Sequence, residues 1–132
     1  RCGWLDLTVL RHAHRMNGFD GVTLTKLDVL GGIPELKICV GYTIDGEPCH
    51  EVPADIGKLA KCVPVYETMP GFPAHSLEEW LEIARTASKE KSGFTALPEN
   101  AQAYVSRIET LLGFPIISVG VGPDRDATIE KI

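Results

Sequence analysis

The feature that most constrains the fold of this chain is an amphipathic segment that leads directly into a short apolar run. Between residues 4 and 13, apolar side chains recur at helical spacing, namely Trp4, Leu7, Leu10 and Ala13. Asp6 suits the first turn of such a helix, and Asn17-Gly18 suits its end. The apolar run Gly21–Leu24 follows at once. A helix that steps straight into a strand is typical of α/β folds.

The remaining sequence alternates between strand and helix signals. A two-residue hydrophobic period over Leu36–Ile44 predicts a strand with one buried face. Asp45-Gly46 then predicts a hairpin turn, with a return strand near Pro48–Val52. Two more strands are expected over Val63–Met69 and Ile116–Val119. These signals favour an α/β fold that contains a β-hairpin.

Two helices are expected in the second half of the chain. Ser76 and Glu79 form a capping box before an amphipathic stripe, and Pro98 opens a second helix that ends at Gly113. Trp4 and Trp80 recur with leucines at helical spacing, so both are expected in the core. The sequence contains no internal repeat and no signal for a domain boundary. Residues 1–132 are therefore expected to form a single unit.

Composition narrows the class of protein. A chain of 132 residues with 44% hydrophobic residues is large enough for one modest domain with a core. Its net charge of −5 argues against a nucleic-acid partner, and no apolar run is long enough to cross a membrane. The four cysteines are far apart in sequence, which favours reduced thiols in a cytoplasmic protein over a zinc site or disulfide framework. Because the chain begins with Arg1 rather than Met, we expect a processed, excised or incomplete chain.

The strand over Gly21–Leu24 ends in Thr25-Lys26-Leu27-Asp28, which suggests guanine recognition. A carboxylate accepts hydrogen bonds from the guanine N1–H and 2-amino group, whereas adenine offers neither donor. The lysine stem can lie along the base while its ammonium group stays in water. The alternative is an exposed Lys-x-Asp at the end of a strand, which four residues alone cannot distinguish. Gly120-Val121-Gly122 similarly permits close approach of a flat ligand, or only shapes a tight turn.

Five segments in order resemble the carboxyl-terminal third of the adenylosuccinate synthetase family. They are residues 1–6 (RCGWLD), 24–30 (LTKLDVL), 66–71 (YETMPG), 97–102 (LPENAQ) and 120–125 (GVGPDR). The resemblance implies a homodimeric cytoplasmic ligase of purine biosynthesis that joins IMP and L-aspartate as GTP is hydrolysed. By the same resemblance, the fold is part of a mixed-sheet nucleotide-binding fold with flanking helices. Phe72, where the family usually has tryptophan, and a long helical segment over Ala74–Thr95 depart from the family pattern.

The resemblance also assigns residues within the chain. Lys26, Leu27 and Asp28 match the guanine-recognition segment of the family, and Gly120-Val121-Gly122 matches its second guanine-contacting loop. The family's phosphate-binding loop, Mg²⁺ ligands and catalytic residues lie upstream of Arg1. No catalytic residue and no metal ligand is therefore expected here. For the two loops to border one base, their strands must end at the same edge of a sheet.

Two other functions remain open on the sequence alone. One is a stand-alone guanine-nucleotide binding module, although the chain lacks the Gly-x-x-x-x-Gly-Lys-Ser/Thr loop that would hold the phosphates. The other is an interaction domain that uses the helix over Ser76–Lys91 and the strand over Leu36–Ile44. His12 and His14 are two residues apart on the first helix, so they face different directions and do not form a metal pair.

Overall fold

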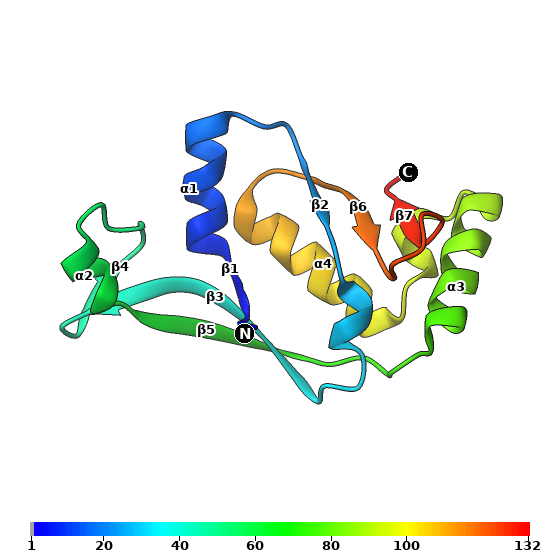
Figure 1. Cartoon of the computed structure of the whole chain (residues 1–132), viewed down its shortest axis with the longest axis horizontal. Coiled ribbons are helices and arrows are strands. Elements are labelled where there is room, and N and C mark those ends of the chain that lie inside the picture. Colours follow the sequence, from blue (N-terminus) through cyan, green and yellow to red (C-terminus); the bar gives the residue numbers. More distant parts are fainter. Residues whose placement is uncertain (1) are drawn as a thin grey trace. The chain divides into compact units, whose positions relative to one another are not determined.

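The computed structural model describes residues 2–132. In chain order its elements are β1 (Leu5–Asp6), α1 (Leu7–Asn17), β2 (Val22–Leu24), the 3₁₀ helix η1 (Leu27–Leu30), β3 (Glu35–Ile44), β4 (Glu47–Cys49), α2 (Ile56–Ala60), β5 (Val63–Pro70), α3 (Leu77–Glu90), the 3₁₀ helix η2 (Gly93–Ala96), α4 (Glu99–Leu112), β6 (Ile116–Gly120) and β7 (Thr128–Glu130) (Figure 1). The predicted α/β class with a hairpin is confirmed. Contacts divide the chain into two compact units, Arg1–Phe19 with Leu36–Met69, and Asp20–Glu35 with Pro70–Ile132.

The first unit contains a mixed sheet around the long strand β3. Strand β1 pairs with β3 in parallel, β4 pairs with it antiparallel, and β5 also pairs with β3. The β3–β4 turn is the predicted hairpin, with Asp45 at φ 51° and Gly46 at φ 81°, both left-handed as a type I′ turn requires. Cys39 is as buried as Leu36 and Ile38, so the prediction of one buried face is wrong. Side chains pack on both faces of the strand.

Helix α1 begins three residues later than its apolar spacing suggests. The Asp6 carboxylate accepts hydrogen bonds from the backbone N–H groups of Thr8 and Val9, at 2.9 and 3.2 Å. Asp6 is therefore the N-cap rather than a first-turn residue, because its oxygen replaces the missing helical acceptor. Trp4 precedes the helix and is only partly buried, so its predicted place in the core is wrong. The helix ends at Gly18 in the left-handed conformation, as predicted.

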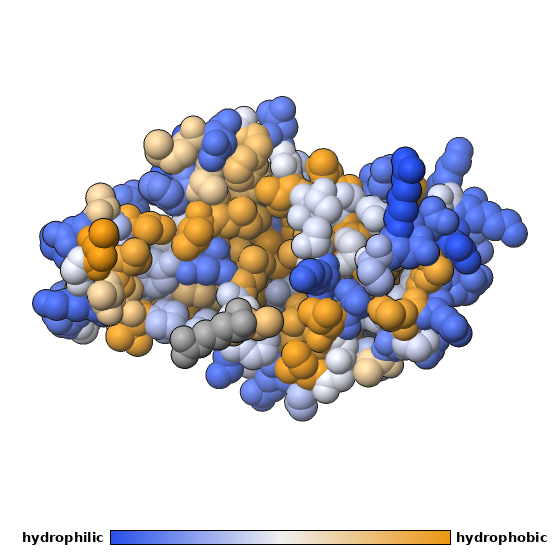
Figure 2. Space-filling view, in the orientation of Figure 1, coloured by the Kyte–Doolittle hydropathy of each residue, from blue (hydrophilic) through white to orange (hydrophobic). Residues whose placement is uncertain are grey.

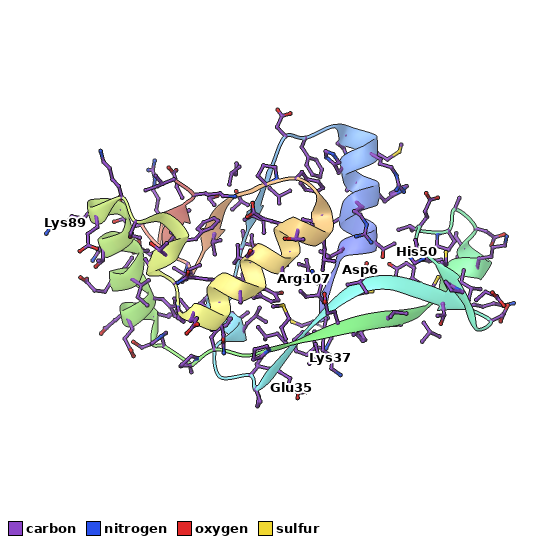
Figure 3. All side chains as sticks on the ribbon, turned by 180° about the vertical axis from the view of Figure 1, so that it is seen from behind. Asp6, Glu35, Lys37, His50, Lys89 and Arg107 are labelled. Atoms are coloured by element: carbon purple, nitrogen blue, oxygen red, sulfur yellow. The ribbon has the colours of Figure 1, made fainter. Side chains whose placement is uncertain are left out.

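Asp6 also binds the buried side chain of Tyr42. The Tyr42 hydroxyl donates to the second Asp6 oxygen, so one carboxylate joins the start of α1 to β3; Figure 3 shows Asp6 at this position. Burial, and then the hydrogen bond to Asp6, raises the pKa of Tyr42. Because the folded pKa exceeds the unfolded value of about 10, this contribution to stability is complete below pH 10 and declines as the pH rises toward the folded pKa.

Tyr42→Phe is expected to lower the free energy of unfolding by about 1.5–3 kcal/mol at neutral pH, since a hydrogen bond to a charged group is lost. The difference from the parent chain should narrow above pH 10, where the parent loses the same contribution. Urea unfolding between pH 7 and 11 measures both effects. Tyr66→Phe, at a tyrosine that is 42% exposed, is the control. A constant difference across this pH range would contradict the assignment.

The second unit contains the sheet β2–β6–β7 and the helices α3 and α4. Strand β6 lies in the middle, parallel to β2 and antiparallel to β7. Both predicted strands are confirmed, whereas the short strand β7 was not predicted. Burial of Tyr104 on α4 raises its pKa to about 12, as expected for a core side chain.

Helix α3 starts at the predicted capping box, in which Glu79 N donates to Ser76 Oγ and Ser76 N donates to Glu79 Oε1, both at 3.1 Å. Trp80 on this helix is fully buried, as predicted. Phe72 is also buried and meets Trp80 edge to face, with ring centroids 6.1 Å apart. Phe72 lies in the loop between β5 and α3, and its ring is nevertheless part of the core. Helix α4 ends at Gly113 as expected, but Pro98 is its N-cap rather than its first residue.

Hydrophobic side chains are also exposed on the first unit. Exposed residues on α2 and β5 are Ile56, Leu59, Val63, Val65 and Tyr66, and Figure 2 shows hydrophobic surface around the end of the unit that carries α2.

Among residues 2–132, no helix is both long enough and apolar enough to cross a membrane.

Candidate functional site

The two predicted guanine-contacting loops leave the same edge of one sheet. In the parallel pair β2 and β6, Thr23 lies opposite Ser118 and Leu24 opposite Val119. Because the strands run in the same direction, the loop after Leu24 and the loop after Gly120 both begin at their carboxyl ends. The expectation that these loops share an edge is confirmed.

The first loop holds Lys26 in an unusual backbone conformation. Lys26 has φ 60° and ψ 34°, the left-handed region that residues with a Cβ rarely adopt. It is the N-cap of η1, where Val29 N donates to Lys26 O at 3.3 Å and Gly31 N donates to Asp28 O at 3.1 Å. Leu27 is buried and anchors the turn, whereas Lys26 is exposed and Asp28 is half-buried. The turn therefore leaves the two polar side chains at the edge of the sheet.

The second loop is a compact turn between β6 and β7. Val121 N donates to Ala127 O at 2.8 Å, and Ala127 N donates to Asp124 O at 3.0 Å. Val121 and Ala127 are buried beneath the turn. Asp126 pairs with Arg85 of α3 at 3.6 Å, and both side chains are more than half exposed. Helix α3 therefore contacts this loop, although an exposed pair of this kind adds at most about 1 kcal/mol.

The two glycines of this loop have different reasons to be glycine. A Cβ on Gly122 would lie 3.2 Å from the Ala127 Cβ, so packing within the turn already disfavours a side chain. A Cβ on Gly120 would lie 3.5 Å from the Thr25 Cα, an ordinary contact, and its backbone is not left-handed. The fold therefore tolerates a side chain at Gly120. A side chain there would contact the backbone of Thr25 and Lys26 in the first loop.

Two backbone hydrogen bonds hold the segment that follows η1 against residues 71 and 72, and we call this pair of hydrogen bonds the clasp. Gly71 N donates to Pro34 O and Gly32 N donates to Phe72 O, each at 2.9 Å. The Asn100 amide on α4 donates to Gly71 O at 2.8 Å. These contacts give a structural reason for the Pro-Gly and Leu-Pro-Glu-Asn segments quoted above.

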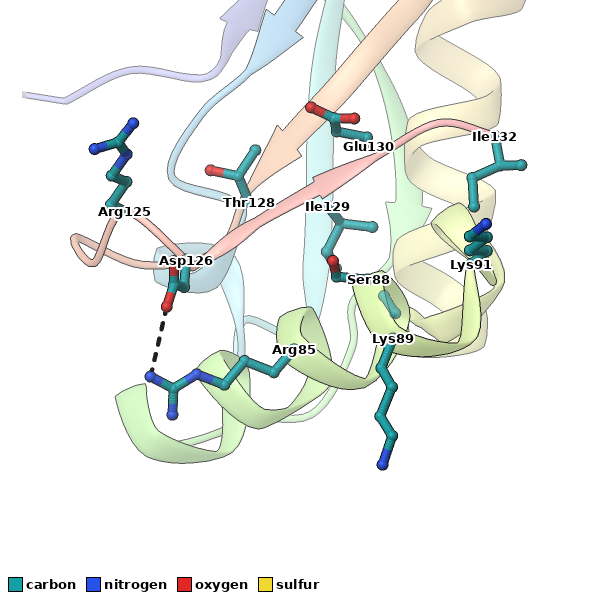
Figure 4. Close-up of a pocket in the computed structure, with 11 residues that line it drawn as sticks. Arg85, Ser88, Lys89, Lys91, Arg125, Asp126, Thr128, Ile129, Glu130 and Ile132 are labelled. Carbon is teal, nitrogen blue, oxygen red and sulfur yellow. Dashed lines mark ion pairs between the residues drawn. The ribbon is translucent and has the colours of Figure 1, made fainter.

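A separate hollow of about 670 Å³ lies between α3 and β7 and is drawn in Figure 4. Arg85, Lys89 and Arg125 border it, but in Figure 4 they extend in different directions rather than toward one point. Within the described part of the chain, no group of three His, Cys, Asp or Glu side chains is arranged to hold a metal ion. Cys2, Cys39, Cys49 and Cys62 are free thiols.

Comparison with known proteins identifies the family. A sequence model described as adenylosuccinate synthetase matches residues 1–129. The chain belongs to the adenylosuccinate synthetase family. It is 49% identical over 129 residues to the adenylosuccinate synthetase of Desulfatibacillum aliphaticivorans and 46% identical to that of Geobacter sulfurreducens, with 98% of the chain aligned in each case.

The family match covers a limited portion of each relative. The chain spans 27% of the length of both bacterial adenylosuccinate synthetases. The structure of fully ligated adenylosuccinate synthetase from Plasmodium falciparum matches 100% of this chain and 29% of that protein, with 35% identity and a TM-score of 0.83. The mixed α/β fold is therefore shared with a portion of a solved adenylosuccinate synthetase.

Proposed function

We propose that residues 1–132 are the carboxyl-terminal portion of an adenylosuccinate synthetase and carry the guanine end of its GTP site. The whole enzyme joins IMP and L-aspartate to give adenylosuccinate while GTP becomes GDP and phosphate, which commits IMP to AMP synthesis. The observation that carries this proposal is the parallel pairing of β2 with β6, which places Lys26–Asp28 and Gly120–Gly122 at one sheet edge. Homodimer formation and a cytoplasmic location belong to the same proposal.

The groups at this edge match the chemistry of guanine. Asp28 offers two acceptor oxygens to the N1–H and 2-amino donors of the base. Lys26, two residues before Asp28, is exposed, and its aliphatic stem can cover a face of the base. The left-handed backbone of Lys26 is the kind of local strain that folds keep at functional sites. Adenine would place a ring-nitrogen acceptor against the Asp28 carboxylate, so the site selects GTP over ATP.

The chemical steps require groups outside residues 2–132. Mg²⁺ in phosphoryl-transfer enzymes is usually held by one or two carboxylates together with the substrate phosphates, and we place those phosphates outside residues 2–132. We assign Mg²⁺, the phosphates and the catalytic groups to the preceding part of the enzyme. The role of this chain is to bind and orient the base, which sets the position of the distant γ-phosphate through the length of the nucleotide.

Activity assays with two proteins test this assignment. The full-length enzyme that contains this chain is expected to form adenylosuccinate from IMP, L-aspartate, GTP and Mg²⁺, and to use ATP poorly. Residues 1–132 alone are expected to form none. Product is measured by liquid chromatography with mass detection, after intact mass has excluded full-length contamination of the short chain. Product from the short chain, or equal use of ATP by the full-length enzyme, would overturn the proposal.

A further inference from the structure

The β2–β6–β7 sheet has one buried face and one open polar face. Strand β6 points Val119 into the core, and β7 points Ile129 the same way. In Figure 4, Ile129 projects toward α3, whereas Thr128 and Glu130 project from the opposite side of β7. The open face is therefore the one that carries Thr128.

Two rows of small or polar residues cross this open face. In the first row, the Thr23 and Ser118 hydroxyls are hydrogen-bonded at 2.7 Å, which shows that β2 and β6 present them on the same side. The second row lies two residues further along each strand. There Gly120 pairs with Thr128 on one side and lies against Thr25 on the other. This second row borders the two candidate guanine loops.

Gly120 lies in the middle of this second row, next to the backbone of Thr25 and Lys26. It occupies the middle strand and has no side chain, although a Cβ at this position would make only ordinary van der Waals contacts. Asp28 follows β2 on one side of Gly120, and Thr128 begins β7 on the other side. The outer strands β2 and β7 are two strand spacings apart, roughly 9.5 Å, which is comparable to the width of a purine ring with a hydrogen-bonding group at each edge.

We propose that Thr128 is a further guanine-binding residue, whose hydroxyl donates to N7 of the base. This inference rests on the proposed GTP site. If Asp28 binds the N1 and 2-amino edge, the imidazole edge of the purine faces β7. That edge carries N7, which can only accept a hydrogen bond. A threonine hydroxyl can donate, whereas neighbouring Asp126 and Glu130 are acceptors when ionised. Thr128 is exposed on the open face, so its hydroxyl is accessible.

Steady-state kinetics of the full-length enzyme with GTP and 7-deaza-GTP test the pairing. 7-Deaza-GTP carries C–H in place of N7 and keeps the donors that Asp28 binds. Thr128→Val is expected to raise the Michaelis constant for GTP about 3- to 10-fold, with little change in turnover number. The parent enzyme should show a similar rise with 7-deaza-GTP. The variant should bind both nucleotides equally, because the two changes remove the same hydrogen bond.

Three variants separate this role from structural effects. Thr128→Ser keeps the hydroxyl and should retain the parent preference for GTP. Thr43→Val, at a strand position in the other sheet, should change neither Michaelis constant. Asp28→Asn tests the guanine site itself. Suppose that Asp28→Asn raises the Michaelis constant for GTP. If Thr128→Val then raises the Michaelis constants for GTP and 7-deaza-GTP by the same factor, or raises neither, the Thr128 assignment is wrong. If neither variant affects GTP use, the proposed site itself is wrong.

Discussion

Asp28→Asn in the full-length enzyme is expected to raise the Michaelis constant for GTP by about 30- to 1,000-fold, equivalent to about 2–4 kcal/mol. Asparagine has nearly the same size as aspartate but replaces one acceptor oxygen with an NH₂ donor. Guanine presents only donors at N1 and the 2-amino group, so one hydrogen bond is lost and two donors face each other. The turnover number should change less, because the base is remote from the transferring phosphoryl group.

Xanthosine triphosphate provides the matched test of the same variant. It has a carbonyl at position 2, which the NH₂ group introduced by the substitution can satisfy, so it should become the better substrate. Asp20→Asn removes the same charge from an exposed position just before β2 and should leave both Michaelis constants unchanged. If Asp28→Asn keeps the parent Michaelis constant for GTP and uses xanthosine triphosphate no better than the parent enzyme does, Asp28 does not recognise guanine.

Gly71→Ala is expected to produce the largest loss of stability among the glycine-to-alanine substitutions in the second unit. An alanine Cβ at this position would lie 1.7 Å from Ile33 O and 2.9 Å from Ile33 C. Both are backbone atoms, so no side-chain rotation can relieve the overlap. The clasp must open, which breaks the hydrogen bonds between Gly71 N and Pro34 O and between Gly32 N and Phe72 O. We expect a loss of about 3–5 kcal/mol, or failure to fold.

Gly120→Ala is the matched control for this substitution. Its Cβ would meet the Thr25 Cα at an ordinary 3.5 Å, so the free energy of unfolding should change by less than about 1 kcal/mol. Denaturant unfolding measures both variants, and soluble yield with limited proteolysis replaces it if the Gly71 variant cannot be purified. A Gly71→Ala protein as stable as its Gly120→Ala counterpart would show that the clasp does not hold this unit together.

Local sequence signals placed most of the helices and strands. Hydrophobic period, capping residues and turn glycines identified α1, β3, the hairpin at Asp45-Gly46, α3 and α4, because these signals act over only a few residues. Several short elements escaped prediction, α2 and β7 among them. Helix α2 has five residues and no buried side chain, and β7 has three residues, so neither offers a full period to detect. The apolar spacing also placed the start of α1 at Trp4, whereas the helix begins at Leu7 because Asp6 is its N-cap.

The division of the chain into two compact units was not visible in the sequence. Each unit combines two stretches that are far apart along the chain, so no linker or change of composition marks the boundary. The burial of Phe72 was missed for a similar reason. Its partner Trp80 lies on the following helix, and a loop residue gives no periodic signal that it will meet a buried ring.

The sequence by itself determined the local elements, the family resemblance and the candidate residues Lys26–Asp28 and Gly120–Gly122, because each depends on residues close together in the chain. Tertiary structure decided that β2 and β6 are parallel neighbours, which places these two segments at one edge. It also brought Thr128 beside Gly120 and Asn100 against Gly71. Pairings of this kind depend on chain segments that meet only after folding, and a single sequence contains no local signal for them.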